Sequence, residues 1–491
     1  MSFIQVKNLS FEYPGSYENI FKDISFVFDT HFKTALIGRN GRGKTTLLRL
    51  FMHQYEYQGE INIQEECQYF PYHVQNDQFY TIDVCFEIEP QLLKWQLEKE
   101  LRLLDVDPQD VFYRSFCTLS KGEQTKVLLA VLFLKPHSYL LIDEPTNHLD
   151  QQSRQIVAQY LKKQKGFLLV SHDRFFIDAC CDHVIAINPT SIDVVSGNFS
   201  SWYDNKEKKD ALELKQNEKL KKDIVKLENS RRQKAQWSDQ VEKSKIGAAD
   251  KGHVGHMAAK MMKRSKSIEK RKNKSIEQKM GLLKDIEEYD DLKLSPLSYF
   301  QSPFLRFSHF SLGYQNKLLF HDLSLSIESH DRILLKGKNG CGKSSLIAFI
   351  MGANIDYQGD FSIGSRLKIS YVPQDCSYLK GSLDDYIKEY QVDETLVKTI
   401  LRKLGFSRIQ FEKTLNQYSE GQKKKVMLAI SLATSAHLYI WDEPLNYIDI
   451  FSRMQLEKLI LKYQPTLLFV EHDGYFQQTI ATKVIDFDEL I

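Results

Sequence analysis

The chain has 491 residues, which is too long for one hydrophobic core and predicts two or three domains. Hydrophobic residues make up 42% and charged residues 26%, which excludes collagen-like, disordered and disulfide-scaffold proteins. The net charge is +2, but residues 231–274 contain 14 Lys or Arg and 4 Asp or Glu, so they carry +10 and the remainder carries −8. This asymmetry predicts a polyanionic partner for the middle of the chain.

The cysteines and the apolar segments indicate a location in the reducing cytoplasm. The seven cysteines are odd in number and form no CxxC pair, which argues against a disulfide framework and against a zinc site. The N-terminus lacks a basic region followed by an apolar core, and nowhere do 18 uncharged apolar residues run together. We therefore expect a cytoplasmic protein with no segment that enters a membrane unaided.

Three apolar runs in the first half predict buried parallel strands, and each run ends at a polar motif. They are TALIG at 34–38, YLLID at 139–143 and GFLLVS at 166–171. Parallel α/β sheets bind ligands at the carboxyl ends of their strands. This layout predicts a nucleotide-binding α/β domain over residues 1–200.

The first run leads into GRNGRGKT, which has the GxxxxGK[ST] spacing of a phosphate-binding loop, or P loop. In such a loop backbone N–H groups surround the phosphates, the lysine reaches the β- and γ-phosphate oxygens, and the hydroxyl coordinates Mg²⁺. For a single copy, a glycine turn without a ligand is the alternative. The predicted nucleotide-binding residues are Gly38, Arg39, Asn40, Gly41, Arg42, Gly43, Lys44, Thr45 and Thr46.

An acidic pair ends the second apolar run. The strand delivers Asp143 to the metal, and Glu144 can polarise the water that attacks the γ-phosphate. A pair of helix N-capping acids after a strand is the alternative interpretation.

Residues 201–302 leave the α/β pattern and predict a basic helical hairpin. Apolar residues recur at helical spacing over 220–227 and over 276–283, with glycines between these segments. A helix of about 28 residues would span roughly 42 Å, and the tip near 237–266 lies within the +10 stretch. An extended basic hairpin suits contact with phosphate backbones. A solvated linker without a partner is the alternative.

Residues 303–491 repeat the motifs of the first half. GKNGCGKS follows GRNGRGKT by 299 residues, WDEPLNYID follows IDEPTNHLD by 299, and EHD follows SHD by 300. A second nucleotide-binding domain is therefore predicted, with Asp442 and Glu443 in the roles of Asp143 and Glu144. Its predicted nucleotide-binding residues are Gly337, Lys338, Asn339, Gly340, Cys341, Gly342, Lys343, Ser344 and Ser345.

Two further segments resemble motifs of the ATP-binding-cassette (ABC) family. The sequences beginning at Ser120 and at Ser419 look like the family's signature motif. The D-loop aspartates and the switch histidines follow in the family's order, at Asp150, Asp449, His172 and His472. The resemblance implies two tandem P-loop ABC domains of α/β fold that hydrolyse ATP with Mg²⁺. It also implies that each P loop faces the signature motif of the other domain across a composite site.

The same resemblance assigns roles to single residues. His172 and His472 act with the catalytic Glu144 and Glu443. Tyr13 and Tyr314 stand where the family stacks the adenine ring, although a surface or core tyrosine is the alternative. The signature residues that face ATP are Ser120, Gly122, Ser419 and Gly421. The residues implied to hold Mg²⁺ are Thr45, Asp143, Ser344, Gln374 and Asp442.

The sequence departs from the family pattern in two places. Gln374 matches the family's Q-loop glutamine, but the first half has Tyr72 at that position, so the first site is expected to hold its metal or water differently. Lys121 and Glu420 replace the first glycine of each signature. We expect nucleotide binding to survive these changes, while turnover could differ between the sites.

The chain as a whole resembles the ABC-F group of ribosome-associated ATPases. WDEPLNYID, GQKKKV, IGRNGRGKTTLLRL and MKRSK are similar to segments of the Lsa/Vga group of antibiotic-resistance proteins, closest to Lsa. This resemblance implies that a monomer with paired cassettes binds the ribosomal tRNA exit site in its ATP-bound form. The linker then contacts 23S rRNA and the P-site tRNA, and protects the peptidyl-transferase centre from lincosamides, pleuromutilins and streptogramin A.

Three other functions remain open at this stage. A housekeeping translation factor of the same group would share every ATPase motif. The cytoplasmic ATPase subunit of a transporter would share the two domains, but it needs no basic projection. A structural DNA-binding ATPase could use the same basic hairpin.

Overall fold

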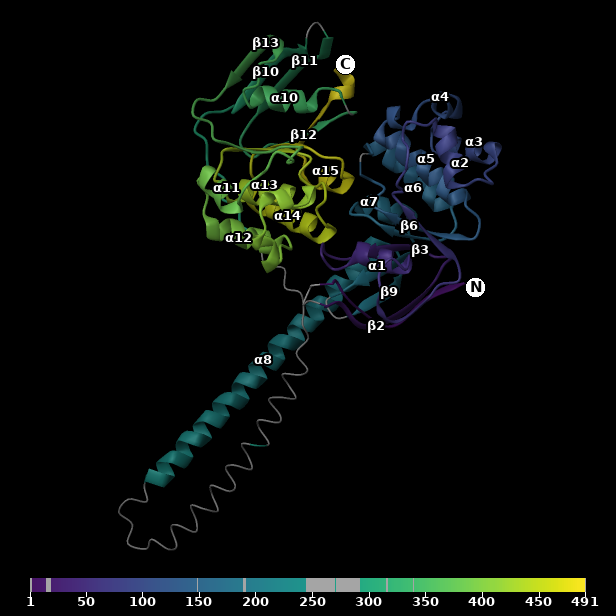
Figure 1. Ribbon diagram of the computed structural model, residues 1–491. Coiled ribbons are helices and arrows are strands. Elements are labelled where there is room, and N and C mark those ends of the chain that lie inside the picture. Colours follow the sequence, from purple (N-terminus) through teal and green to yellow (C-terminus); the bar gives the residue numbers. More distant parts are fainter. Residues whose placement is uncertain are drawn as a thin grey trace, which may run out of the picture. The chain divides into compact units, whose positions relative to one another are not determined.

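The computed structural model describes residues 2–14, 19–147, 149–188, 191–243, 270, 292–314, 317–338 and 340–490. Met1–Ser200 and Tyr289–Ile491 together form one compact unit, and Ser201–Glu288 form another. Below, residues 1–200 are called cassette 1 and residues 303–491 cassette 2 (Figure 1). The predicted fold class of two tandem α/β P-loop domains is confirmed.

The main sheet of cassette 1 has the strand order β5-β6-β7-β3-β8-β9, and only β9 runs antiparallel to its neighbour. A second sheet, of order β2-β1-β4, is antiparallel. The strands are β1 (Phe3–Glu12), β2 (Asn19–Asp29), β3 (Lys33–Ile37), β4 (Gln58–Asn62), β5 (Glu66–Phe70), β6 (Ser138–Asp143), β7 (Phe167–Val170), β8 (His183–Ile187) and β9 (Ile192–Ser196).

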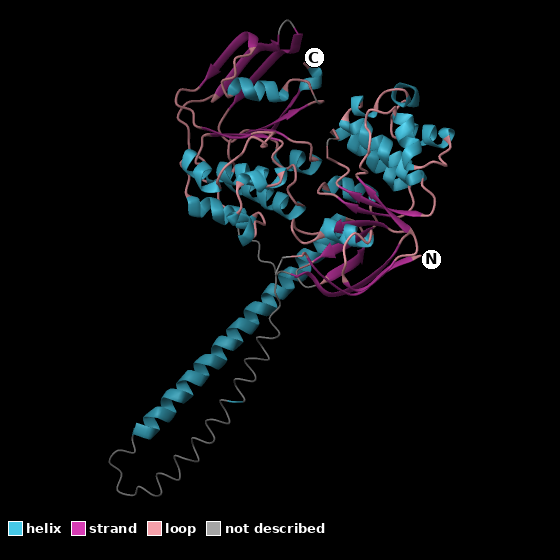
Figure 2. Ribbon diagram, viewed as in Figure 1, coloured by secondary structure: helices cyan, strands magenta, loops and turns pink. Residues whose placement is uncertain are grey.

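The helices of cassette 1 flank these strands (Figure 2). Helix α1 follows β3 and α6 follows β6, so both begin at the carboxyl edge of the main sheet. The helices are α1 (Lys44–Phe51), α2 (Thr81–Ile88), α3 (Lys94–Leu103), α4 (Pro108–Phe112), α5 (Lys121–Leu134), α6 (Gln151–Lys163) and α7 (Arg174–Cys180).

Cassette 2 repeats this plan. Its main sheet is parallel, with the order β14-β15-β16-β12-β17, and its second sheet is antiparallel, with the order β11-β10-β13. The strands are β10 (Leu305–Tyr314), β11 (Lys317–Ile327), β12 (Arg332–Lys336), β13 (Asp356–Ile363), β14 (Ile369–Val372), β15 (Leu438–Asp442), β16 (Leu467–Val470) and β17 (Lys483–Asp486). The helices are α10 (Lys343–Ile350), α11 (Leu383–Glu389), α12 (Glu394–Lys403), α13 (Glu420–Ala433), α14 (Ile450–Tyr463) and α15 (Gly474–Ile480).

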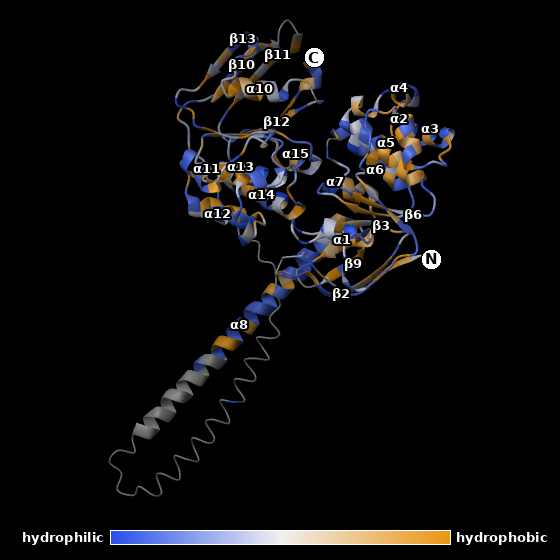
Figure 3. Ribbon diagram, viewed as in Figure 1, coloured by the Kyte–Doolittle hydropathy of each residue, from blue (hydrophilic) through white to orange (hydrophobic). Residues whose placement is uncertain are grey.

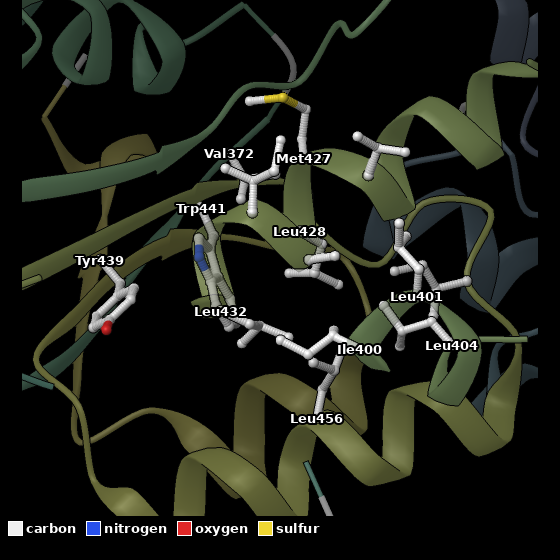
Figure 4. Packing of buried hydrophobic residues seen from close by; sticks show 14 of the residues in the cluster. Val372, Ile400, Leu401, Leu404, Met427, Leu428, Leu432, Tyr439, Trp441 and Leu456 are labelled. Atoms are coloured by element: carbon white, nitrogen blue, oxygen red, sulfur yellow. The ribbon is translucent and has the colours of Figure 1, made fainter. Parts of the chain in front are cut away.

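The apolar runs seen in the sequence are the central strands. Every residue of β7, β15 and β16 is buried, because helices or the second sheet cover both faces of a parallel sheet. One side of the cassette 2 sheet packs on α12, α13 and α14 through Ile400, Leu428 and Leu456, all 2% exposed or less (Figure 4). This packing fixes the ends of β12 and β15, where the functional side chains lie.

Helix α8 spans Phe199–Lys243, 45 residues, or roughly 68 Å at 1.5 Å per residue. It is longer than the helix expected from the sequence. Of the predicted apolar stripe, Ile224 is buried. Along the part of α8 that Figure 3 colours by hydropathy, hydrophobic stretches alternate with hydrophilic ones. The second predicted helix and residues 244–266 of the predicted tip lie outside the described residues. Leu292 and Leu294, which the sequence pattern assigned to the linker, are buried in the core of cassette 2.

Candidate active site

The first P loop connects β3 to α1. Gly41 and Gly43 have φ values of 84° and 88°, in the left-handed region that favours glycine. A Cβ atom on Gly43 would lie 2.6 Å from Ile20 Cγ2, so a side chain has no room there. Gly43 caps α1, whose first-turn N–H groups form an anion site. The loop therefore has the backbone geometry that phosphate binding requires.

Both P-loop lysines lie against their own loops. Lys44 Nζ donates to Gly38 O at 2.7 Å, and Lys343 Nζ donates to Gly337 O at 2.8 Å and to Lys338 O at 2.7 Å. Burial lowers the pKa of Lys44, against the opposing influence of Asp449, Glu144 and Asp143. A loop that holds its lysine among carbonyl groups is able to transfer it to phosphate oxygens.

The remaining predicted P-loop residues lie around these two lysines. Gly342 has φ 101° and caps α10 as Gly43 caps α1. Cys341 is buried, and Lys343 Nζ lies 3.5 Å from its Sγ atom. Asn339 lies outside the described residues. The other members are Arg39, Asn40, Arg42, Thr46, Lys338, Gly340 and Ser345, in the loops or in the first turns of α1 and α10.

The predicted metal ligands of each cassette lie together. Thr45 Oγ1 donates to Asp143 Oδ2 at 2.9 Å, and Ser344 is hydrogen-bonded to Asp442. Asp442 Oδ1 is buried without a hydrogen-bond partner among the described residues. Burial raises the pKa of Asp442 to about 6. Hydroxyl and carboxylate oxygens beside a phosphate loop suit Mg²⁺, and a cation would satisfy this unpartnered oxygen.

Glu144 is partly buried, and the backbone of His172 donates a hydrogen bond to its carboxylate. Glu144 follows β6 with φ 52°, and His172 Nε2 lies 3.3 Å from its Oε1. That oxygen has no hydrogen-bond partner among the described residues. Burial, and secondly the charge of Asp143, raise the pKa of Glu144 to about 8. Burial also lowers the pKa of His172 well below its usual value. The side chains of Glu144 and His172 are therefore both largely uncharged near neutral pH.

Glu443 has the same backbone bend, with φ 49°, but it is held by donors. Gln374 Nε2 donates to Oε1 at 2.8 Å, Asn446 Nδ2 donates to Oε2 at 2.7 Å, and His472 Nε2 lies 3.6 Å from Oε1. Burial would raise its pKa, but His472, Gln374 and Asn446 outweigh burial and lower the pKa to about 2. Gln374, predicted as a metal ligand, thus contacts Glu443, the predicted catalytic residue, in this structure.

Both signature motifs begin a helix through a capping box. Glu123 N donates to Ser120 Oγ at 3.2 Å, and Gln422 N donates to Ser419 Oγ at 3.3 Å. Gly122 and Gly421 lie in the first turns of α5 and α13. A Cβ atom on Gly421 would lie 2.7 Å from Tyr447 Cβ, so the second signature closely approaches the turn before Asp449.

Two hydrogen bonds connect the first P loop with the region of the second signature, which the sequence predicts to form the first composite site. Asn40 Nδ2 of the first P loop donates to Tyr447 O of cassette 2 at 2.9 Å. Tyr447 in turn donates to Glu420 Oε2 at 3.2 Å. The first P loop is therefore linked to the second signature through Tyr447.

The second composite site is linked differently. Arg154 Nη1 of cassette 1 donates to His472 O of cassette 2 at 3.2 Å, and Asp150 and Lys338 line one cavity of about 310 Å³. Within the described part of the chain, no hydrogen bond joins Ser120 or Gly122 to the second P loop.

The two predicted adenine-stacking tyrosines differ in setting. Tyr13 forms a hydrogen bond of 2.8 Å with Thr46 Oγ1 and packs edge-to-face on Phe11, which places it beside the first P loop. Tyr314 ends β10 and is 47% exposed. Tyr13 therefore already has a protein partner, whereas the Tyr314 ring is open to solvent.

Sequence motifs did not indicate several residues that contact the site. Tyr69 donates to Asp143 Oδ2 at 2.9 Å, and Tyr72, at the Q-loop position, has no hydrogen bond within the described residues. Lys424 Nζ donates to Pro373 O at 2.6 Å and to Asp442 O at 2.8 Å, which holds the Q loop to the end of β15. The lysine-rich segment GQKKKV could have indicated Lys424, whereas no sequence motif includes Tyr69 of β5.

No helix in the described ranges combines the length and apolar composition of a membrane span. A model of the ABC transporter family matches residues 21–147 and 320–446. The chain is 27% identical to the Ribosome protection protein VmlR of Bacillus subtilis, covering 98% of this chain and 86% of that protein. It is 26% identical to the Energy-dependent translational throttle protein EttA of Escherichia coli, covering 96% of this chain and 90% of that protein.

Two further similarities cover almost the whole chain. ABC transporter F family member 5 of Arabidopsis thaliana is 26% identical, covering 99% of this chain and 75% of that protein. The archaeal ribosome recycling factor aABCE1, solved in complex with the ribosomal stalk protein aP1, aligns with a TM-score of 0.63 at 17% identity. That alignment covers 98% of this chain and 87% of the solved chain, and it shows a common fold.

Proposed function

The chain belongs to the ABC transporter family and hydrolyses ATP, and from that premise we propose that it is an ABC-F protein that binds the bacterial ribosome in its ATP-bound form. The observation that carries this proposal is the 45-residue helix α8, which follows cassette 1 in the chain and continues into the +10 stretch. A basic helical segment suits rRNA and tRNA phosphates. Relatives named as a ribosome protection protein and a translational throttle protein support it.

ATP would act by drawing the two cassettes together. The first P loop is hydrogen-bonded to the backbone of Tyr447 in cassette 2. Nucleotide bound at Lys44 would therefore contact both cassettes. The closed form would fit the ribosome, and loss of the γ-phosphate would reopen the chain. This mechanism requires a monomer whose cassettes pair within one chain.

The glutamates, the histidines and the metal-binding residues would have separate roles in ATP hydrolysis. Glu144 and Glu443 would orient and polarise the attacking water, with His172 and His472 beside them to hold the γ-phosphate end. When bound, Mg²⁺ would neutralise charge on the phosphates, held by Thr45 with Asp143 and by Ser344 with Asp442. The role of Gln374 at the metal stays a prediction, because in this structure Gln374 positions Glu443.

The finer assignment is ribosome protection in the cytoplasm. The chain would occupy the tRNA exit site, with the linker on 23S rRNA and the P-site tRNA, and protect the peptidyl-transferase centre from lincosamides, pleuromutilins and streptogramin A. Similarity to VmlR supports this assignment. The motifs that resemble Lsa suggest the same drug classes.

The test is to trap the ATP-bound form. Glu144→Gln together with Glu443→Gln should leave ATP bound and uncleaved, so the purified variant should co-sediment with ribosomes in ATP but not in ADP. A matched control adds Lys44→Ala and Lys343→Ala, which should abolish co-sedimentation. A trapped variant that stays in the supernatant with ATP would refute the proposal.

Similarity to EttA favours a second candidate, a translation factor that gives no drug protection. Both candidates bind ribosomes, so susceptibility to lincomycin and tiamulin separates them. Expression of the wild-type chain, but not of the doubly trapped variant, should raise resistance if the chain protects ribosomes. Unchanged susceptibility together with ribosome binding would favour the translation factor.

A further inference from the structure

A buried ion pair joins the two cassettes away from the catalytic residues. Arg174, the first residue of α7, contacts Glu457 of α14 through its guanidinium group. Both residues are 5% exposed. The guanidinium also lies over the Tyr475 ring of cassette 2, 3.9 Å from the ring centroid. Cassette 1 thus places one cation between a carboxylate and an aromatic ring of cassette 2.

The other half of the repeat has no such pair. Arg154 and Arg453 lie 299 residues apart, and their Nε atoms donate to Leu149 O and Ile448 O at 3.0 Å and 2.9 Å. They therefore mark equivalent turns of α6 and α14. At the same offset, Glu457 corresponds to Ala158.

A cavity lies where the second pair would be. Asp173 and Asp473 cap α7 and α15 in the same way, so Arg174 corresponds to Gly474. Ala158 and Gly474 both line a cavity of about 360 Å³, together with Phe175 and His472. The Arg174–Glu457 ion pair therefore fills one place in the repeat, and a cavity occupies the equivalent place at Ala158 and Gly474.

The ion pair lies beside the first composite site. Arg174 follows the switch residue His172 by two positions, and Glu457 is on the helix that Asp449 caps. The pair thus ties the switch loop of cassette 1 to the D-loop helix of cassette 2. The cavity instead borders His472 and Gln151, which belong to the switch loop and the D-loop helix of the second composite site.

We propose that Arg174 and Glu457 are positioning residues that keep the first composite site assembled throughout the ATPase cycle, so that the cassettes separate at the second site. Separation at the first site would divide a buried ion pair and leave each charge without its partner. Separation at the second site would widen a cavity and break the hydrogen bond from Arg154 to His472 O, but among the described residues it would divide no buried ion pair of this kind. The proposal goes beyond ribosome binding and rests on ATP hydrolysis alone.

Nucleotide retention gives the readout. The purified full chain is incubated with radiolabelled 8-azido-ATP and Mg²⁺, passed rapidly through a desalting column, irradiated and digested. Retained label is then assigned to peptides of cassette 1 or cassette 2. We expect cassette 1 peptides of the wild type to hold at least about fivefold more label than those of cassette 2, because the assembled site releases nucleotide slowly.

Breaking the pair should remove this difference. Arg174→Ala and Glu457→Gln should each bring the label ratio to about one, and Arg174→Glu with Glu457→Arg should restore it in part. Lys483→Ala is the matched control, because it removes the Lys483–Asp331 ion pair of 2.7 Å inside cassette 2 and should leave the ratio unchanged. Thermal melting verifies that each variant is folded.

Two results would overturn the proposal. Equal label on the two cassettes of the wild type would show that neither site is held together preferentially. An unchanged ratio in a folded Glu457→Gln chain would show that the pair does not position the first site. Both outcomes concern the isolated protein, so neither depends on whether the chain binds ribosomes.

Discussion

The surroundings of Glu144 and Glu443 differ although the two residues occupy equivalent positions in the repeat. Both follow a buried strand with positive φ and both face a histidine. Glu443 receives hydrogen bonds from Gln374 and Asn446, whereas Glu144 Oε1 receives none within the described residues. Equivalent motifs thus yield one carboxylate whose pKa is lowered and one whose pKa is raised. The motif alone does not determine the catalytic power of a site.

Substitution of the two glutamates should change kcat more than any other variant, and by different amounts at the two positions. Glu443→Gln should lower kcat for ATP by about 10³-fold, as for loss of a well-placed general base. Glu144→Gln should lower kcat less than about threefold, because Oε1 of its carboxylate has no hydrogen-bond partner within the described residues and burial raises its pKa to about 8. Phosphate release by the purified chain measures both. Equal losses in the two variants would show that the two glutamates contribute equally to hydrolysis.

The stability of the two variants should depend on pH in opposite ways. The folded pKa of Glu443, about 2, is below the unfolded value, so its contribution to stability is present above about pH 4.5 and is lost as the pH falls towards 2. Glu443→Gln should therefore lower the free energy of unfolding by about 3 kcal/mol at pH 7.

The folded pKa of Glu144, about 8, is above the unfolded value, so ionisation opposes folding increasingly as the pH rises from 4.5 to 8. Glu144→Gln should raise Tm by about 5 °C at pH 8 and leave it unchanged at pH 4.5. Melting curves of nucleotide-free protein provide the measurement. A Tm gain of equal size at both pH values would contradict the pKa assignment.

Exchange of the Q-loop residues tests whether the Gln374 hydrogen bond causes the difference between the two glutamates. Gln374→Tyr gives cassette 2 the residue of cassette 1, removes the 2.8 Å bond to Glu443, and should lower kcat about tenfold. The reciprocal Tyr72→Gln, placed in a Glu443→Gln chain, should raise the residual activity. If Gln374→Tyr leaves kcat unchanged, the donor is not what distinguishes the sites.

The smallest expected effect concerns Tyr69. Tyr69→Phe removes the bond to Asp143 Oδ2 and should change the Mg²⁺ concentration for half-maximal nucleotide binding about threefold. Tyr371→Phe is the control, because Tyr371 stands at the equivalent strand position and its hydroxyl group has no hydrogen bond in the part of the chain that the structure describes. Equal shifts in both variants would discount a specific role for the Tyr69 hydroxyl.

The sequence predicted the fold because its signals are local and repeated. The apolar runs before Gly38 and Gly337 predict buried parallel strands, because their side chains must be kept from water. The glycines in the loops that follow have the positive φ that a P loop requires. The motifs also predicted which side chains lie together, such as Thr45 with Asp143. The catalytic and metal-binding roles of these residues stay predictions.

The contacts that distinguish the two sites could not be predicted in this way. Arg174 and Glu457 lie 283 residues apart and belong to no motif. Tyr69 follows the ordinary pattern of a buried strand. Asn446 is part of a motif, but only the fold reveals that its amide reaches Glu443. Alignment of the two halves does carry one signal, since it sets Arg174 opposite Gly474 and Glu457 opposite Ala158.

The arrangement of Lys44 and Lys343 affects how fast nucleotide is captured. Each ammonium group rests on carbonyl oxygens of a loop whose glycines Gly41 and Gly43, or Gly340 and Gly342, already have the positive φ values of a phosphate-binding turn. An arriving triphosphate exchanges one set of oxygen acceptors for another, and the chain orders few additional residues at that moment. Encounter, not loop refolding, then limits the association rate. Adenosine, which has no phosphate to offer the cation, gains nothing from this exchange and should compete poorly.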